Sequence, residues 1–154
     1  MADSIRELII KNIKTTLEGI TTGAVYNNTA ASVQRFRQSG QSQVAFPMVI
    51  IREGAETSKD VPLGKITHHL IIDLLLIVVH DESSDARQSD EVMNSFLADV
   101  QKAMLADRTR GGHAVETNLQ GSEPLDVEDA QRDIEQVVSF EVQYRHSATD
   151  PCVA

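Results

Sequence analysis

The sequence predicts an α+β domain in which two helices pack on one face of an antiparallel or mixed β-sheet, in the order α-β-β-β-α-β-β. Three observations favour this fold class. Residues 66–81 form a long apolar run rich in isoleucine and valine, which indicates a central strand. Residues 4–19 and 92–105 repeat apolar side chains at helical spacing. Residues 134–145 alternate apolar and polar side chains, as a strand with one buried face does.

The first helix is expected to begin at Ser4, because Glu7 follows at the spacing of a capping box. It ends near Gly19. Strands are predicted at residues 32–38 and 44–52, with a turn at residues 39–42 between them. Pro47 cannot donate a backbone hydrogen bond, so it must lie at an edge, at a bulge or at the start of its strand.

Residues 53–65 hold two glycines and a proline and have no apolar periodicity, so they predict a long exposed hairpin loop. The central strand then pairs antiparallel with the strand before that loop. Its even-numbered face is almost wholly apolar, whereas its odd-numbered face is polar at the start and apolar from Leu75 onward. We therefore expect both faces of the strand to be covered at one end and one face at the other.

The second helix is expected to begin after a cap at Ser89 or Asp90 and to end before Gly111. A short strand follows at residues 114–120, then an acidic exposed loop at residues 121–133. The last strand is followed by an extended tail, residues 146–154, and all 154 residues form one domain. The expected core comprises Ile9, Ile13, Leu17, Phe96, Val100, Met104, Val138, Phe140 and Val142, together with Leu70, Ile72, Leu74 and Leu76 or their opposite-face neighbours.

Composition excludes several classes of protein. Hydrophobic residues make up 41% and charged residues 24%, which is typical of a globular domain. The formal net charge of −9 argues against a general nucleic-acid binder, which must neutralise phosphates. The one cysteine, Cys152, excludes a disulfide scaffold or a cysteine-based metal site within one chain. The N-terminus is too charged for a signal peptide, so we expect a cytosol-like compartment.

The sequence offers little catalytic chemistry. It has five histidines but no HExxH and no GxSxG pattern. The two glycines at 111–112 follow a helix, whereas a phosphate-binding loop precedes one. We therefore predict that the protein is not an enzyme and holds no cofactor or metal. The alternative is a small metal-dependent hydrolase that uses His80, Asp81 and His146.

Charge placement suggests an interface. No acidic residue lies between Glu18 and Glu53, while the loop at residues 121–133 is strongly acidic. These charges either form solvated surfaces or make a head-to-tail contact, in which a basic strand meets a neighbour's acidic loop and a ring closes. The candidate residues for subunit or tube contacts are Arg35, Arg37, Arg52, Glu56, Lys59, Asp60, Arg108, Arg110, Glu128 and Asp129.

Four segments, which together cover most of the chain, resemble the tail-terminator (tail-completion) proteins of long-tailed bacteriophages. They are SIRELIIKNIKTTLEGITT, ITHHLIIDLLLIVVHD, SDEVMNSFLADVQKAMLADRTRGGHAVET and VVSFEVQYRHSATDP. The segment VEDAQRDIEQVV departs from this pattern because it is more charged than the resemblance leads us to expect.

This resemblance implies an α+β structural protein without enzymatic activity, which forms a hexameric ring that caps the tail tube, stops its polymerisation and meets the head-side connector. It also implies a virion-tail location after assembly in the host cytoplasm, DNA passing through the ring without sequence-specific binding, and no membrane. Another ring of the head–tail connector remains the alternative. In such a ring we expect residues 53–65 to dock on a neighbouring ring, and deletion of residues 56–60 to leave the fold intact.

Overall fold

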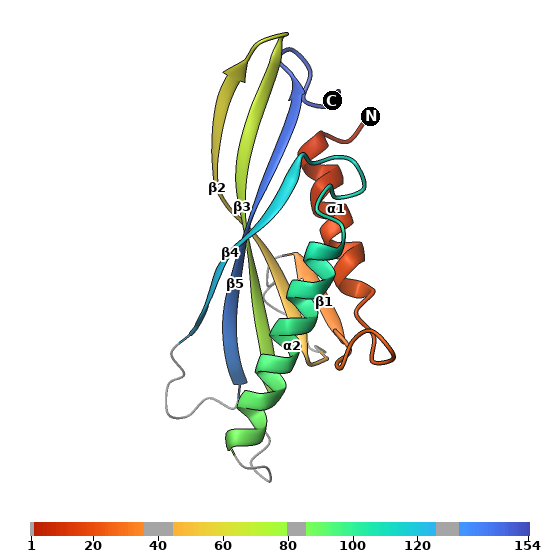
Figure 1. Ribbon diagram of the computed structural model, residues 1–154, viewed down its shortest axis with the longest axis vertical. Coiled ribbons are helices and arrows are strands. Elements are labelled where there is room, and N and C mark those ends of the chain that lie inside the picture. Colours follow the sequence, from red (N-terminus) through yellow and green to blue (C-terminus); the bar gives the residue numbers. More distant parts are fainter. Residues whose placement is uncertain (1, 36–44, 80–85, 126–132) are drawn as a thin grey trace.

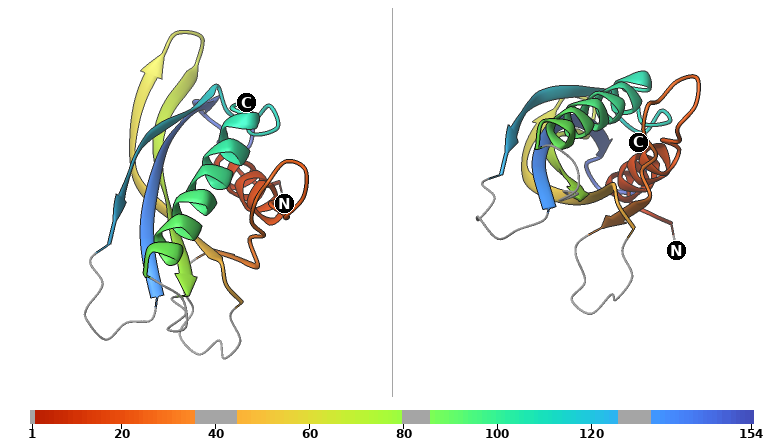
Figure 2. Two further views of the ribbon diagram at one scale, coloured as in Figure 1. Left: turned by 60° about the horizontal axis from the view of Figure 1, so that its bottom comes forward. Right: turned by 90° about the horizontal axis from the view of Figure 1, so that it is seen from below.

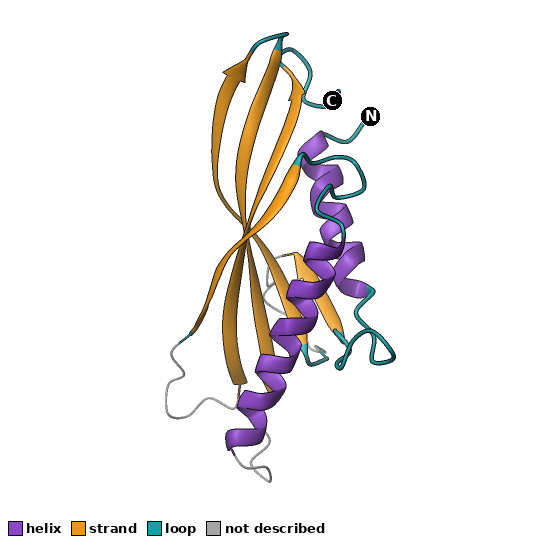
Figure 3. Cartoon of the chain, in the orientation of Figure 1, coloured by secondary structure: helices purple, strands orange, loops and turns teal. Residues whose placement is uncertain are grey.

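One five-stranded sheet carries both helices on the same face, as the computed structural model shows (Figure 1). The structure describes residues 2–35, 45–79, 86–125 and 133–154. Its strands lie in the order β1-β2-β3-β5-β4. The predicted two-layer α+β fold and the predicted order of elements are confirmed (Figure 3). The elements are α1 (Ile5–Glu18), β1 (Ser32–Arg35), β2 (Met48–Val61), β3 (Lys65–Val79), α2 (Ala86–Ala106), β4 (Glu116–Pro124) and β5 (Asp133–Ser147).

β3 is the middle strand, as predicted, and pairs antiparallel with β2 on one side and β5 on the other. Its even-numbered side chains from Leu70 to Leu76 are fully buried, because the helices cover that face. On the opposite face, Ile77 is buried beside Met48 and Ile50 of β2. β3 is therefore covered on both faces around Ile77, as the sequence predicted, whereas Val79 at its very end is exposed. The whole predicted core is buried, including every helix position named for it.

Helix α1 begins as expected: the Ser4 hydroxyl accepts a hydrogen bond from the backbone N–H of Glu7 at 3.2 Å. The helix ends at Glu18, and Gly19 follows. Pro47 directly precedes β2, one of the places the sequence allowed. However, β1 and β2 are parallel, with Ser32 opposite Met48, and do not form the expected hairpin. The connection through residues 36–47 has the dozen or so residues that a parallel link requires.

The predicted loop at residues 53–65 is wrong. β2 continues to Val61 and β3 begins at Lys65, so only three residues form the turn. Paired with β5, this hairpin projects past the end of the helical layer, where both faces of β2 meet solvent (Figures 1 and 2). An exposed strand has no apolar face to give a period of two, which is why the pattern suggested a loop. Deleting residues 56–60 would remove paired strand residues, so that deletion would not leave the fold intact.

Helix α2 starts at Ala86, earlier than the predicted caps at Ser89 and Asp90, because residues 86–89 contain no helix breaker. It ends at Ala106, before the glycines, as expected. The Asp107 carboxylate accepts hydrogen bonds from the Thr109 hydroxyl at 2.7 Å and from the amides of Gly111 at 2.7 Å and Thr109 at 2.9 Å, and these bonds lower the Asp107 pKa. Positive φ values at residues 110–112 then turn the chain away from the helix.

Arg110 is fully buried, which contradicts its assignment to an interface. Its guanidinium donates to the carbonyl oxygen of Met104 and so satisfies an acceptor in the last turn of α2. Burial lowers the pKa of this guanidinium, because the charged form loses its hydration. Arg110 therefore caps the helix from inside the domain and cannot meet another subunit.

β4 runs to Pro124, beyond the predicted end at residue 120, because pairing with β5 resumes after an irregularity between Leu119 and Gly121. The rest of the predicted acidic loop, residues 126–132, lies outside the described residues. β5 buries Val138, Phe140, Val142 and Tyr144, as predicted.

The tail after β5 is not extended, contrary to expectation. Ala148 donates its amide to the Gly64 carbonyl at 2.8 Å, and Ile5 donates to the Pro151 carbonyl at 2.9 Å. The tail therefore turns back and ties the hairpin turn to the start of α1.

We predict that Leu17→Ala lowers the free energy of unfolding by about 2–5 kcal/mol, because Leu17 is fully buried and the substitution leaves a cavity. Chemical denaturation measures this change. Val25→Ala is the matched control, since Val25 is 56% exposed and should change stability little. A loss below about 0.5 kcal/mol for Leu17→Ala would remove this residue from the core.

Candidate functional site: the anchor of the hairpin

A β-bulge in β2 points two glutamates toward the helices. Glu53 lies opposite Ile72 and Glu56 opposite Leu70, so three steps along β2 match two along β3. Residues three apart on a regular strand face opposite sides, whereas here the extra residue brings both glutamates to the helical face. Gly54 sits in the bulge, where a Cβ atom would lie 3.1 Å from the Ile71 carbonyl oxygen. The close approach of the two strands therefore favours glycine at this position, because a side chain would push the Ile71 carbonyl away by a few tenths of an ångström.

Two arginines meet these glutamates. Arg6 of α1 binds Glu53 through Nε at 2.9 Å and Glu56 through Nη1 at 2.9 Å. Arg35 of β1 binds Glu7 at 2.7 Å and Glu53 at 3.3 Å. The hydrogen bonds that Arg35 donates to Glu7 raise the Arg35 pKa despite partial burial. The carboxylates of Glu53 and Glu56 are only 18% and 21% exposed, so these ion pairs are less screened than surface pairs.

Above the arginines, three rings stack against the hairpin. His68 lies between Tyr144 and His146, with ring centroids 4.7 Å and 4.5 Å away. The Tyr144 hydroxyl donates to Glu56, which joins the stack to the ion pairs. Burial raises the Tyr144 pKa, and the bond to Glu56 adds to that rise because it favours the neutral phenol. We call the set Arg6, Glu7, Arg35, Glu53, Glu56, Ser58, His68, Tyr144 and His146 the hairpin anchor.

The two histidines have fixed hydrogen-bond roles. His146 Nδ1 lies 2.7 Å from the Ser147 carbonyl, which only accepts, so this nitrogen carries a proton. His146 Nε2 is then the acceptor in the neutral ring, and His68 Nε2 donates to it at 2.7 Å. His68 Nδ1 accepts in turn from the Ser58 hydroxyl at 2.7 Å. With both rings neutral, each bond in this chain has one donor and one acceptor, and the two facing nitrogens cannot both carry protons.

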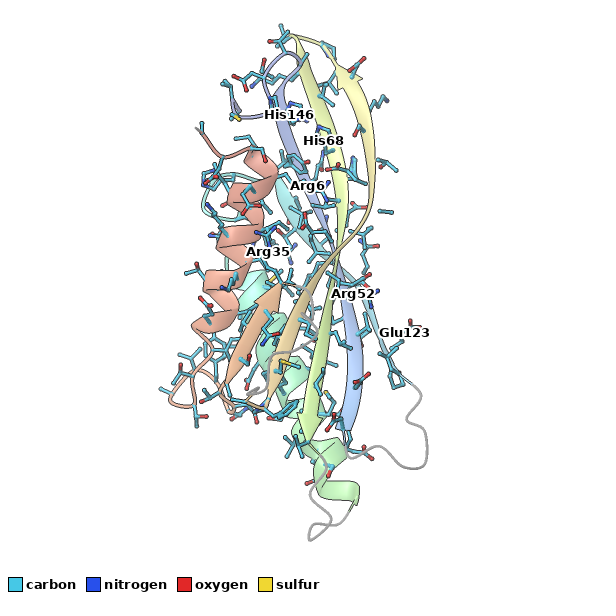
Figure 4. The ribbon with its side chains drawn as sticks, turned by 180° about the vertical axis from the view of Figure 1, so that it is seen from behind. Arg6, Arg35, Arg52, His68, Glu123 and His146 are labelled. Atoms are coloured by element: carbon cyan, nitrogen blue, oxygen red, sulfur yellow. The ribbon has the colours of Figure 1, made fainter. Side chains whose placement is uncertain are left out.

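His68 is 9% exposed, and burial lowers its pKa, because the imidazolium would lose its hydration. The Glu56 charge opposes this shift, whereas the His146 and Arg6 charges add to it. The anchor thus joins α1, β1, β2, β3 and β5 through charged and polar contacts (Figure 4). It can position the hairpin.

The structure places the predicted interface residues in different environments. Arg35 and Glu56 belong to the anchor. Lys59 and Asp60 are exposed on the hairpin. Arg52 is exposed on the side of the sheet away from α1, opposite Asp73 (Figure 4). Arg108 binds Glu116 at 3.0 Å within its own chain, while Arg37, Glu128 and Asp129 lie outside the described residues.

The hydrolase alternative depends on His146 and on His80 and Asp81, of which the last two lie outside the described residues. His146 pairs with Ile66, near the hairpin turn. Val79, which directly precedes His80, pairs with Asp133 at the other end of β3. Thirteen residue steps along β3 lead from Ile66 to Val79, a distance of about 43 Å. The described end of β3, at Val79, therefore lies far from His146, and the hydrolase remains an alternative hypothesis.

Sequence reasoning missed the anchor and a second polar site at Asp99. The buried Asp99 carboxylate accepts from the amides of Asn27 and Asn28 and from the Asn28 side chain, at 2.8–3.2 Å. These bonds hold the segment after α1 against α2. The only signal was a polar residue within the apolar stripe of α2, because contacts between distant segments leave no local pattern.

No group of three or more histidine, cysteine or acidic side chains in the described part of the chain is arranged to hold a metal ion. None of the described helices is long and apolar enough to cross a membrane. Comparison with models of known protein families and with curated proteins found no match.

We predict that stability falls as pH decreases through the ordinary histidine pKa of 6.5, because the folded state binds a proton at His68 less tightly than the unfolded chain does. Denaturation at about pH 7.5 and about pH 5.5 measures the loss. His68→Gln should reduce this pH dependence. His113→Gln, outside the anchor, is the control and should retain it. Equal pH dependence in wild type and His68→Gln would show that His68 does not titrate in this way.

Proposed function

We propose that this protein is a structural subunit of a bacteriophage tail, of the tail-terminator type. In this proposal a hexameric ring caps the tail tube, ends its polymerisation and joins the tail to the head connector. Its partners are further copies of the chain, the tail tube protein and the connector protein, while genomic DNA passes through the lumen without sequence-specific contacts. The ring assembles in the host cytoplasm and remains in the virion tail, and it performs no catalysis.

The observation that carries the proposal is a hairpin that is firmly braced yet absent from the core. Residues 57–60 and 62–65 are exposed, and none of them belongs to the buried core clusters. Nevertheless, the anchor fixes the base of the hairpin with half-buried ion pairs, and the tail fixes its turn. An ordered projection of this kind lowers the entropy cost of binding and is expected of a subunit that docks on another protein.

The edges of the sheet also support assembly with defined geometry. β1 covers β2 only from Met48 to Ile51, and among the described strands none pairs with the outer side of β2 beyond that point. That edge carries the bulge and several charges, and β4 on the other edge carries Gly121 and ends at Pro124. Bulges, charges and proline prevent uncontrolled strand pairing, so specific contacts can decide how copies associate.

The proposal does not include the expected contact between Arg35 and a neighbour's acidic loop. Arg35 already binds Glu7 and Glu53 within its own chain. Replacing it with glutamate would place a third negative charge beside those carboxylates and disturb the hairpin anchor. A defect in assembly would then reflect damage to the subunit and would say nothing about an intersubunit pair.

We expect the purified chain to form a closed ring of uniform size, measured by native mass spectrometry and electron microscopy. Added to isolated tail tubes from the phage that encodes it, the ring should bind tube ends and stop further growth. Tubes whose ends already carry native terminator rings are the control and should bind no more protein. A chain that stays monomeric, or rings that ignore open tube ends, would contradict the proposal.

A further inference from the structure

The hairpin turn presents a leucine in an unfavourable position. Leu63 is 96% exposed, and its φ of 73° lies in the left-handed region, which glycine and asparagine adopt more readily. Gly64 follows with φ of 67°, a conformation that glycine adopts without steric cost. Leu63 adopts the same conformation with its Cβ atom crowded against the backbone. Neither burial nor local conformation within the subunit explains leucine here. A strained, exposed apolar residue instead points to a binding function.

A pocket at the opposite end of the molecule has the matching chemistry. It lies between α2 and the ends of β4 and β5 and has a volume of about 520 Å³. Its apolar lining comes from Met93, Pro124, Leu125 and Ile134, and its acidic lining from Asp90 and Glu135. This volume falls in the ordinary range of binding pockets, so a leucine and its neighbours fit.

The charges around the leucine complement that pocket. Lys65 is two residues from Leu63, and Lys59 lies opposite Thr67 on the same hairpin. Asp60 is the one acidic residue among residues 57–67. Residues 57–67 of the hairpin therefore carry one net positive charge beside the exposed Leu63. The pocket lining contains two carboxylates and four apolar residues. Such pairing favours encounter in one orientation and gives specificity.

A chain cannot fill its own pocket. Lys65 pairs with Ser147 at the tip, whereas Val79 pairs with Asp133, next to the pocket residue Ile134. The fourteen strand steps between Lys65 and Val79 span about 46 Å. The tip can therefore enter only the pocket of another molecule.

We propose that Leu63 of one copy inserts into the pocket between α2, β4 and β5 of the next copy, with Lys59 and Lys65 facing the acidic side chains Asp90 and Glu135. This inference rests on the proposed ring and assigns its subunit contact. The contact is head-to-tail, because the two surfaces differ and lie at opposite ends. Each such contact rotates one copy relative to the next. The copies form a closed ring when a whole number of these rotations adds up to a full turn.

Leu63→Asn separates binding from folding. Asparagine accepts the positive φ, so the melting temperature should stay the same or rise, while loss of leucine burial should weaken self-association by about ten- to a hundredfold. Sedimentation velocity over a concentration series measures this change. Val25→Asn is the matched control, because Val25 is also exposed and lies in the loop after α1, apart from both surfaces. It should associate as wild type does.

A mixing experiment tests the direction of the contact. Leu63→Asn keeps the pocket and loses the tip, whereas the double variant Asp90→Lys, Glu135→Lys keeps the tip and reverses the charge of the pocket. Each variant alone should be monomeric. Together they should form a 1:1 dimer and nothing larger, because one intact tip meets one intact pocket and the next contact is missing. A mixture that stays monomeric, or that forms full rings, would overturn the proposed contact.

The outcomes for wild type and Leu63→Asn separate the two proposals. If both form the same closed ring at the same concentration, the contact is wrong and the ring stands. If wild type forms open chains that need Leu63, the contact stands and the ring is wrong. A wild-type protein that remains monomeric throughout the series overturns both.

Discussion

The structure depends on two half-buried carboxylates that a bulge holds on the same face of the sheet. Without the extra residue in β2, one of Glu53 and Glu56 would face away from the helices, and Arg6 could not bind both. With it, α1 reaches across to the hairpin base through charge-assisted hydrogen bonds. Leaving either partner unpaired at this depth would cost more than losing a surface ion pair, because its desolvation would be uncompensated.

This constraint connects the fold to the proposed function. A hairpin that projects past the helices has little apolar burial to stabilise it, and two-stranded ribbons alone are marginal in water. Here β5 adds a third strand, the histidine stack packs against the ribbon, and the tail binds its turn. The exposed end is thus held in one orientation before binding, which is what a repeated contact between subunits needs. The polarity of the molecule, with an apolar knob at one end and an acidic pocket at the other, follows from the same long strands.

Sequence patterns predicted the parts of the fold in which one buried face repeats at a fixed period. β3, β5 and α1 follow this rule, and the core positions predicted for them are all buried, although Ile10 of α1 is buried as well and was not predicted. The hairpin could not be predicted in this way. Thr57–Asp60 are exposed on both faces of their strand, so apolar and polar side chains do not alternate there. The start of α2 was placed too late because polar residues suited to a cap can also occupy helical positions in the first turns.

The candidate site was much less predictable, because each of its contacts joins residues far apart in the chain. Arg6 and Glu56 are 50 positions apart, and His68 and His146 are 78 apart. Only the register of three strands brings them together. Arg110 shows the same limit: two arginines after a helix suggested an exposed basic patch, but the positive φ of the second turned its side chain inward, under the last carbonyls of α2. The sequence shows which residues are charged, but only the folded structure shows which of them are buried.

Amide hydrogen exchange in a double-mutant cycle of Arg6→Gln and Glu56→Gln tests most directly whether the anchor holds the hairpin. If it does, each single variant speeds exchange of the hairpin amides between Thr57 and Thr67, while amides of β3 from Leu70 to Leu76 stay protected. The double variant should then lose less protection than the sum of the two, with a coupling of about 0.5–3 kcal/mol. Hairpin exchange that is unchanged, or that rises equally in the core, would contradict this account.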